Sequence, residues 1–137
     1  MAQDPKQVVR RAIEEVWNRR DAAAAEELIA EGVVWHHNTL GERQGRAAFL
    51  ETVNELRSAF PDTKITVEAL AADGDRVMCH WVASGSHQGS YRGVAASGQS
   101  VTWSGVVVDR VVDGQIVERW TYADNRPAGS PHEIATR

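Results

Sequence analysis

Two Asp-Gly turns in the second half of the chain, Asp73-Gly74 and Asp113-Gly114, constrain the fold more than any other feature. Asp-Gly between two segments of alternating apolar residues favours a tight hairpin, so the segments beside each turn should be antiparallel neighbours. Four strand-like segments surround these turns, and they read TKITVEALA, RVMCHWVASGSHQG, SVTWSGVVVDRVV and QIVERWTYAD. The second half of the chain is therefore predicted to be an antiparallel sheet.

Helical patterns fill the first half of the chain. Asp4 and Pro5 form an N-cap followed by proline at the first helical position. Apolar residues then recur on one helical face, which predicts a helix over residues 5–18. A second helix is predicted to begin at Asp21, with Gly32 as its C-cap.

A third helix is predicted over residues 46–59, where apolar side chains recur at helical spacing until Pro61 ends the pattern. The short segment VVWHH before it is typical of a strand. This order of elements predicts an α+β fold, in which three helices pack on one face of a strongly curved, mainly antiparallel sheet.

Composition limits the classes of function. The 137 residues suit one domain over residues 1–137 with a single core, and the net charge of −4 comes with scattered Lys and Arg. We therefore expect no nucleic-acid partner. No apolar run approaches the roughly 18 residues of a membrane span, and the first residues lack a signal-peptide pattern. We expect a cytoplasmic protein without a membrane partner, and a buried, inert thiol at Cys79.

Several segments together resemble a known family. They are VVRRAIEEVWNRRD, WHHN, GRAAFLETVNELRSAFPDTKITVEALAADGDRV, GSHQGSYRG and DGQIVERWTYAD. The chain is similar in these segments to the SnoaL-like polyketide cyclases, or ester cyclases, of the NTF2-like superfamily. The resemblance implies a cone-shaped sheet that encloses an apolar pocket, closed by helices. It also implies closure of a polyketide ring by intramolecular aldol condensation, without metal or organic cofactor.

Asp124 follows the last strand-like segment, just where its apolar pattern stops. An aldol closure needs a group that takes and returns a proton, and burial in an apolar cavity raises the pKa of a carboxylate toward the useful range. The family's acid/base aspartate lies in this terminal segment, so the resemblance implies that Asp124 is catalytic. If Asp124 faces inward, the strand period places Trp120 and Tyr122 on the same side, as an aromatic wall that binds substrate. The alternative is a turn aspartate.

The histidines supply further candidates. His37 and Asn38 end the first strand-like segment, and the resemblance aligns them with a pocket-side pair. His37 would hydrogen-bond a substrate carbonyl, and Asn38 would donate to an enolate oxygen. His87 lies in GSHQG, which resembles a pocket segment of the family, and it shares a strand face with Trp81. A structural role remains the alternative for each of them.

Trp81 and Trp103 fall in the predicted sheet, where indoles either fill the core or stack on a flat substrate. With Trp120 and Tyr122 they would form an aromatic-lined pocket for a planar, apolar polyketide-like substrate. We expect no metal site, because neither H-x-H nor H-E-x-x-H occurs. A G-x-S-x-G elbow, a P-loop and a Rossmann fingerprint are absent as well.

The chain departs from the family after Asp124. Residues 125–137 are polar and broken by prolines, so a flexible tail is predicted, with one pocket wall missing or supplied by a partner subunit. Relatives often carry a second acid where this chain has Thr121. The opposite strand parity would turn Arg119 and Thr121 inward, a cationic and hydroxyl pair suited to an anion. A carboxylate of Asp124 on the surface would contradict its catalytic role.

Four functions remain open from the sequence. The first is a cofactor-independent cyclase or a related acid/base enzyme acting on an enolisable carbonyl compound. Epoxide hydrolysis, as in limonene epoxide hydrolases, and hydroxylation with a reductase partner, as in some SnoaL-like relatives, are enzymatic alternatives. The fourth is a small-molecule-binding module without catalysis. The fold resemblance further implies a homodimer, with a tetramer as the alternative.

Overall fold

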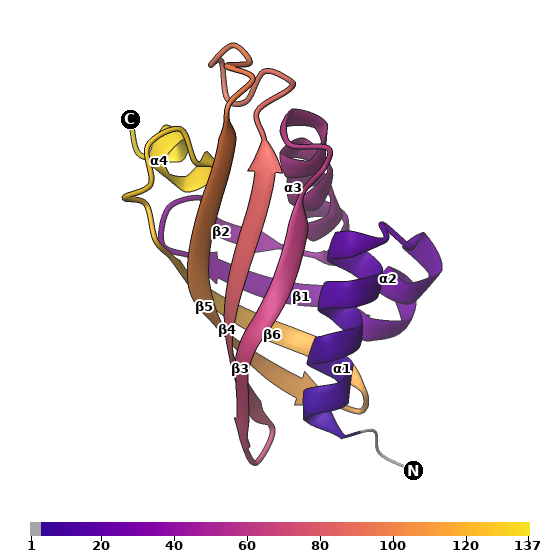
Figure 1. Ribbon diagram of the computed structural model, residues 1–137. Coiled ribbons are helices and arrows are strands. Elements are labelled where there is room, and N and C mark those ends of the chain that lie inside the picture. Colours follow the sequence, from indigo (N-terminus) through magenta and orange to yellow (C-terminus); the bar gives the residue numbers. More distant parts are fainter. Residues whose placement is uncertain (1–3) are drawn as a thin grey trace.

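The sheet of the computed structural model, which describes residues 4–137, has six strands in the order β2-β1-β6-β5-β4-β3. Residues 1–3, included in the single-domain prediction, lie outside the described residues. The strands are β1 (Ile29–His37), β2 (Gly41–Gln44), β3 (Lys64–Asp73), β4 (Arg76–Ser86), β5 (Ser100–Val112) and β6 (Gln115–Ala123). Every pairing is antiparallel except that of β1 with β6. Figure 1 shows how strongly the sheet bends, since β1, β2 and β6 cross behind β3, β4 and β5.

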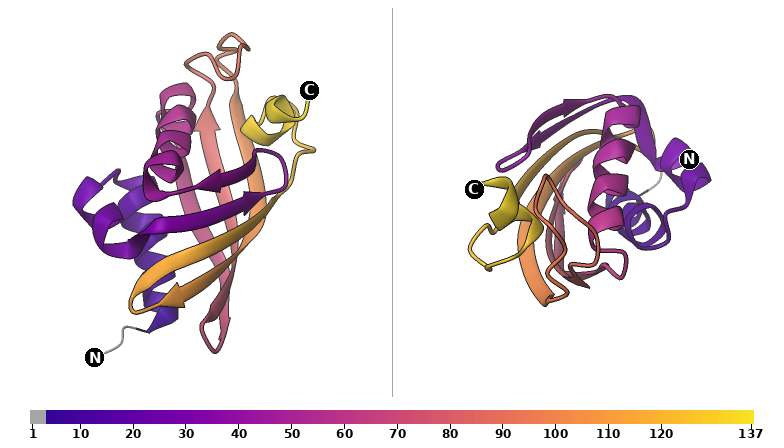
Figure 2. Two further views of the ribbon diagram at one scale, coloured as in Figure 1. Left: turned by 180° about the vertical axis from the view of Figure 1, so that it is seen from behind. Right: turned by 90° about the horizontal axis from the view of Figure 1, so that it is seen from above.

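The helices are α1 (Pro5–Arg11), η1 (Ala12–Asn18), α2 (Ala22–Leu28), α3 (Arg46–Ala59) and α4 (Pro131–Ala135). Figures 1 and 2 show α1, α2 and α3 along one side of the bent sheet, with α4 beside β5 across from them. The predicted α+β fold with a curved, mainly antiparallel sheet is confirmed. Within residues 4–137, none of the helices has the length and apolar character needed to span a bilayer.

Two helices differ from the sequence expectation, one in its type and one in where it ends. The helix over residues 5–18 forms, but its second half, η1, is a π-helix, whose wider turn places the buried Ile13 and Trp17 toward the interior. Gly32 does not cap the second helix, because α2 ends at Leu28 and Gly32 lies inside β1. Strand pairing begins early, since Ile29 already lies opposite Ile116 of β6.

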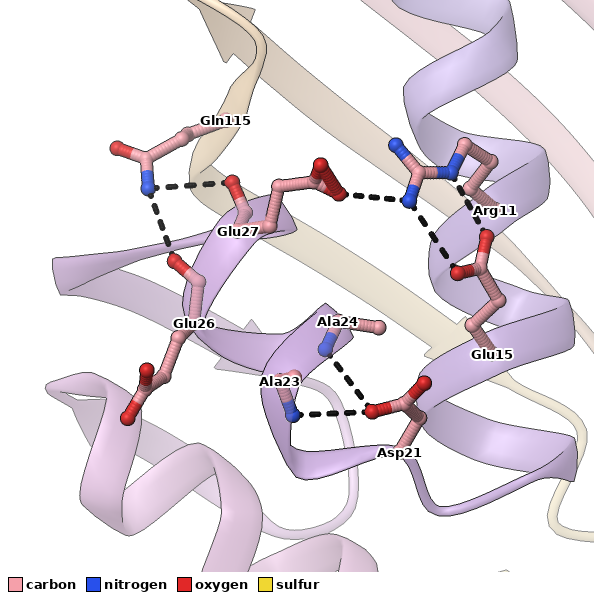
Figure 3. Close-up of polar contacts among 8 residues, drawn as sticks. All are labelled: Arg11, Glu15, Asp21, Ala23, Ala24, Glu26, Glu27 and Gln115. Carbon is pink, nitrogen blue, oxygen red and sulfur yellow. Dashed lines mark hydrogen bonds and ion pairs between the residues drawn. The ribbon is translucent and has the colours of Figure 1, made fainter.

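Polar contacts hold α1, η1 and α2 together, as Figure 3 shows. Arg11 forms ion pairs with Glu15 at 2.7 Å and with Glu27 on α2 at 2.6 Å. Asp21 caps α2 by accepting from the backbone N–H groups of Ala23 and Ala24. The ion pair of Arg11 with Glu27 links α2 to α1, and η1 carries part of the cavity wall.

Side-chain amides fasten two strands. Asn18, at the end of η1, donates to the carbonyl oxygen of Ile65 on β3 at 2.9 Å and accepts from its N–H at 2.8 Å. Asn38, just after β1, makes the same pair of bonds with Ala123 at 3.0 and 2.9 Å. Each amide imitates a neighbouring strand, so it satisfies backbone groups that would otherwise lack a partner.

Cys79 lies fully buried in β4, as expected. Burial raises the pKa of its thiol to about 11, so the side chain is an unreactive part of the core.

Candidate active site

A cavity of about 50 Å³ lies between the helices and the concave face of the sheet. Four indoles line it, those of Trp17, Trp35, Trp81 and Trp103. Polar side chains enter its wall from β1, β6 and α4, namely His37, Arg119, Thr121 and His132. The cavity is an aromatic space with a few polar groups, which is the usual make-up of a small-molecule site.

Two neighbouring strands bring most of the polar groups together. In the parallel pairing of β1 with β6, His37 lies opposite Thr121 and Trp35 lies opposite Arg119. All four side chains line the cavity. The seam between β1 and β6 is therefore the polar wall of the site.

The guanidinium of Arg119 is buried in this wall beside a buried acid. Its Nε and Nη2 donate to the two carboxylate oxygens of Asp109 on β5, at 2.7 and 2.8 Å. Asp109 is fully buried, and Arg119 also lies over the ring of Phe49. Nη1 of Arg119 forms no hydrogen bond with any of residues 4–137, so it remains free to donate to a ligand. The pair as a whole is electrically neutral.

Thr121 has a donor to spare. The indole N–H of Trp35 donates to its hydroxyl oxygen at 2.8 Å. This bond does not use the hydroxyl proton of Thr121. Because Thr121 lines the cavity, that proton can be donated to a ligand there.

His37 is a neutral donor. Its Nδ1 accepts from the backbone N–H groups of Thr39 and Leu40, at 3.1 and 3.2 Å, so the proton of the neutral ring sits on Nε2. Burial, followed by the nearby His132, Arg43 and Arg119, lowers the pKa of His37 to about 3. The ring is therefore uncharged at neutral pH, and Nε2 has no partner among residues 4–137.

His132, which the sequence analysis missed, lies across from His37. The two ring centroids are 5.1 Å apart, and the ring of His132 is also 6.1 Å from that of Trp81. Burial lowers the pKa of His132 to about 4, an effect that the charge of Asp124 partly opposes. His132 is therefore a second neutral imidazole in the wall.

The C-terminal segment that carries His132 is ordered, so the prediction of a flexible tail is wrong. Ser130 accepts from the N–H of Glu133 at 3.1 Å, Glu133 accepts from the N–H of Gly129 at 3.0 Å, and Pro131 occupies the first turn. Ile134 is buried behind them. The letters SPHE already contain a Ser-x-x-Glu capping box, a signal that predicts this helix.

Asp124 lies outside the cavity wall. Its carboxylate turns to Arg126, accepting from Nε at 2.9 Å, from Nη2 at 3.1 Å and from the backbone N–H at 3.0 Å. These bonds hold the pKa of Asp124 below its usual value, the opposite of the predicted rise. The side chain closes a turn, which was the alternative from the sequence.

The predicted orientation of the β6 side chains is wrong as well. Arg119, Thr121 and Ala123 face inward, so Trp120 and Tyr122 lie on the outer face with Asp124. Tyr122 is 58% exposed. Trp120 stacks on His36 and lies under Arg76, instead of lining the cavity.

Of the remaining predicted site residues, two line the cavity and two do not. Trp81 and Trp103 line the cavity as predicted. His87 shares the inward face but is buried beyond the cavity wall, where its ring stacks on Phe60 at 4.9 Å. Asn38 uses both ends of its amide on Ala123 and has little left for a substrate oxygen. Residues 4–137 contain no group of three His, Cys, Asp or Glu side chains that could hold a metal ion.

Comparison with known proteins places this site in a family. The family model for SnoaL-like polyketide cyclases matches residues 7–129, and the chain belongs to that family. The structure resembles IdmH, a proposed polyketide cyclase from Streptomyces antibioticus, with a TM-score of 0.80 and 30% identity over 90% of this chain and 94% of that one. It also resembles AclR, a proposed hydroxylase from Streptomyces galilaeus, with a TM-score of 0.78 and 29% identity over 90% of each chain.

A proposed SnoaL-like polyketide cyclase from Jannaschia sp. CCS1 has the same fold, with a TM-score of 0.80 and 24% identity over 90% of this chain and 91% of that one. Among curated proteins, none matches the chain.

Proposed function

We propose that the protein is a cofactor-independent acid/base enzyme that closes a ring in a polyketide-like, enolisable carbonyl compound. Membership in the SnoaL-like family and the likeness to IdmH support this class of reaction. The observation that carries the proposal is the set of hydrogen-bond donors along β1 and β6. His37 Nε2, the Thr121 hydroxyl and Arg119 Nη1 all have hydrogens to give, and all three residues line one aromatic cavity.

Such a wall suits an oxygen that becomes negative during the reaction, as in an enolate or alkoxide, better than a ligand that is already charged when it binds. Asp109 neutralises Arg119, and His37 is uncharged, so the wall carries no net positive charge that would attract a carboxylate. Neutral donors in a buried cavity gain most when negative charge develops on a bound carbonyl oxygen. An uncharged imidazole that polarises a carbonyl is a known device of enolisation.

The enzymatic alternatives find less support at this site. Epoxide opening needs a carboxylate that activates water, whereas both oxygens of Asp109 are occupied by Arg119 and Asp124 lies outside the wall. The likeness to AclR keeps a hydroxylase-type role as the second candidate.

The cavity of about 50 Å³ holds only a few water molecules. A polyketide of several rings would enter only after side chains or the loop between β4 and β5 move aside. We therefore choose a small probe, diacetylacetone, which still requires some side chains of the wall to move aside. It is a linear triketone whose aldol closure and loss of water give orcinol.

The test measures two reactions of diacetylacetone in D₂O: deuterium uptake at the terminal methyl groups, and orcinol formation. Replacing His37 by Phe removes one oxyanion donor, and we expect kcat to fall by about 10²–10³-fold. His80→Phe, on the exposed face of β4, is the matched control and should behave like the wild type. Tight binding of the triketone without any deuterium uptake would instead indicate a binding module.

A further inference from the structure

One titratable group in the cavity wall has no role in the donor wall described above. His132 is 5% exposed, it lines the cavity, and it reaches the cavity from α4 instead of from the sheet. The capping box of Ser130 and Glu133 fixes the turn of chain that presents it. His132 is thus a buried imidazole that the capped segment holds in the cavity wall, and its chemical role there remains to be assigned.

The hydroxyl of Thr39 joins the two imidazoles. Thr39 Oγ1 lies 3.2 Å from Nδ1 of His37 and 3.4 Å from Nδ1 of His132. Nδ1 of His37 is an acceptor, because two backbone N–H groups point at it. The Thr39 hydroxyl can therefore donate to His37 and accept an N–H from His132.

This arrangement distinguishes the free nitrogens of the two rings. With its proton on Nδ1, His132 keeps a lone pair on Nε2, whereas His37 carries a proton on Nε2. A base and a hydrogen-bond donor then lie side by side in the cavity wall, with ring centroids 5.1 Å apart.

We propose that His132 is the proton-transferring residue of this enzyme. The proposal rests on the ring-closing function proposed above and names the residue that moves the proton.

The steps balance without a cofactor. His132 Nε2 takes a proton from the carbon next to a ketone, and the C–H electrons form the enolate, whose oxygen accepts from His37 Nε2. The enolate carbon then attacks a second carbonyl carbon, forming the C–C bond and an alkoxide. The alkoxide takes the proton back from His132, which leaves a hydroxyketone and the neutral imidazole.

The surroundings of His132 favour a transient cation over a permanent one. Its charged and titratable neighbours are His37 on β1 and Asp124 at the end of β6, while Arg119 in the same wall is neutralised by Asp109. The neutral ring can accept a proton at neutral pH, and the enolate formed in the same step supplies the counter-charge. The charge of Asp124 partly opposes the effect of burial on the pKa of His132, and Asp124 is itself paired with Arg126.

The experiment uses the full chain and diacetylacetone in D₂O. His132→Gln keeps a polar side chain, and we expect deuterium uptake and orcinol formation to fall together by about 10²–10⁴-fold. Binding of the triketone, followed by quenching of tryptophan fluorescence, should stay within about threefold, because His37, Thr121 and Arg119 remain. Asp124→Asn should lose far less activity than His132→Gln.

Chemical rescue makes the test specific to proton transfer. Added imidazole should restore activity to His132→Ala, which leaves a gap in the cavity wall, but not to His37→Ala, where a positioned donor is lost. His80→Gln is the matched control for loss of a histidine, and thermal unfolding verifies that each variant folds.

The outcomes separate the two proposals. Wild-type activity in His132→Gln, with abolition in Asp124→Asn, would overturn the role of His132 and leave the ring-closing function intact. A wild-type protein that binds the triketone but neither exchanges nor cyclises it would remove the proposed function, and the role of His132 with it.

Discussion

The carboxylate of Asp109 holds the guanidinium of Arg119 across the β5–β6 pairing, where the two residues are direct partners in register. Both side chains are buried, and the acid is fully so. The strength of the contact comes from two parallel charge-assisted hydrogen bonds, which also fix the plane of the guanidinium. Nη1 lies outside this contact, and Arg119 lines the cavity.

Removing the acid alone should be costly. Asp109→Ala leaves Arg119 buried without a counter-charge, and we expect the free energy of unfolding in urea to fall by about 3–5 kcal/mol. The double variant Asp109→Leu with Arg119→Met removes both charges and should be more stable than Asp109→Ala. Exposed Glu51→Gln is the neutral control. A double variant as unstable as the single one would show that the ion pair is not the cause.

Stability should fall on acidification because of the two buried imidazoles. Burial lowers the pKa of His37 to about 3 and of His132 to about 4, whereas an unfolded histidine titrates near 6.5. Between those values the unfolded chain binds more protons, so each histidine lowers the free energy of unfolding by at most about 1.4 kcal/mol per pH unit. The loss begins as pH falls through about 6.5.

Urea unfolding at a series of pH values from 7 to 4 measures this slope. The variant His37→Gln with His132→Gln should show a flatter dependence than the wild type. Equal slopes in the two proteins would mean that other groups set the acid sensitivity.

Asn38 should matter for stability and not for substrate. Asn38→Ala loses both hydrogen bonds to Ala123 at an exposed site, and we expect a loss of about 1–2 kcal/mol in the free energy of unfolding. Asn18→Ala, which loses the equivalent pair to Ile65, is the matched comparison. Unchanged stability with weakened triketone binding would return Asn38 to the substrate-binding residues.

The homodimer expected from the sequence would use the outer face of the sheet. Tyr122 and Val106 are cross-strand neighbours there, 58% and 40% exposed, beside a mixture of His36, Glu118 and Arg76 that could pair with itself across a twofold axis. Tyr122→Lys should shift the mass in sedimentation equilibrium from dimer toward monomer. A wild-type protein that sediments as a monomer would contradict the expectation.

The bounds of α3, the hairpins and the inward faces of β4 and β5 follow from local patterns, so Trp81 and Trp103 could be placed from the sequence. Which side chains of β6 face inward could not be predicted from such patterns. Its aromatic residues, Trp120 and Tyr122, alternate with Arg119 and Thr121, and apolar content alone favours burying the aromatics. The outcome depends on Asp109, ten residues earlier, which makes burial of Arg119 tolerable. Such a pairing is visible only once β5 and β6 are in register.

Residues 125–137 were predicted to be a flexible tail, although part of this segment forms a helix. Polar composition and prolines favoured disorder in residues 125–137, although SPHE carries the capping signal of a short helix. Composition describes a segment as a whole, whereas a single cap and one buried apolar residue, Ile134, decide whether five residues form a turn of helix.

The position of α4 has a practical consequence for anyone who handles the protein. His132 lines the cavity from α4, so a substitution or insertion within residues 131–135 acts directly on one wall of the cavity. The cavity wall is also divided between two kinds of structure: a sheet in which every change disturbs two neighbouring strands, and a short segment held by one cap and one apolar side chain. Substitutions in that segment can alter one wall of the cavity while leaving the sheet as it is.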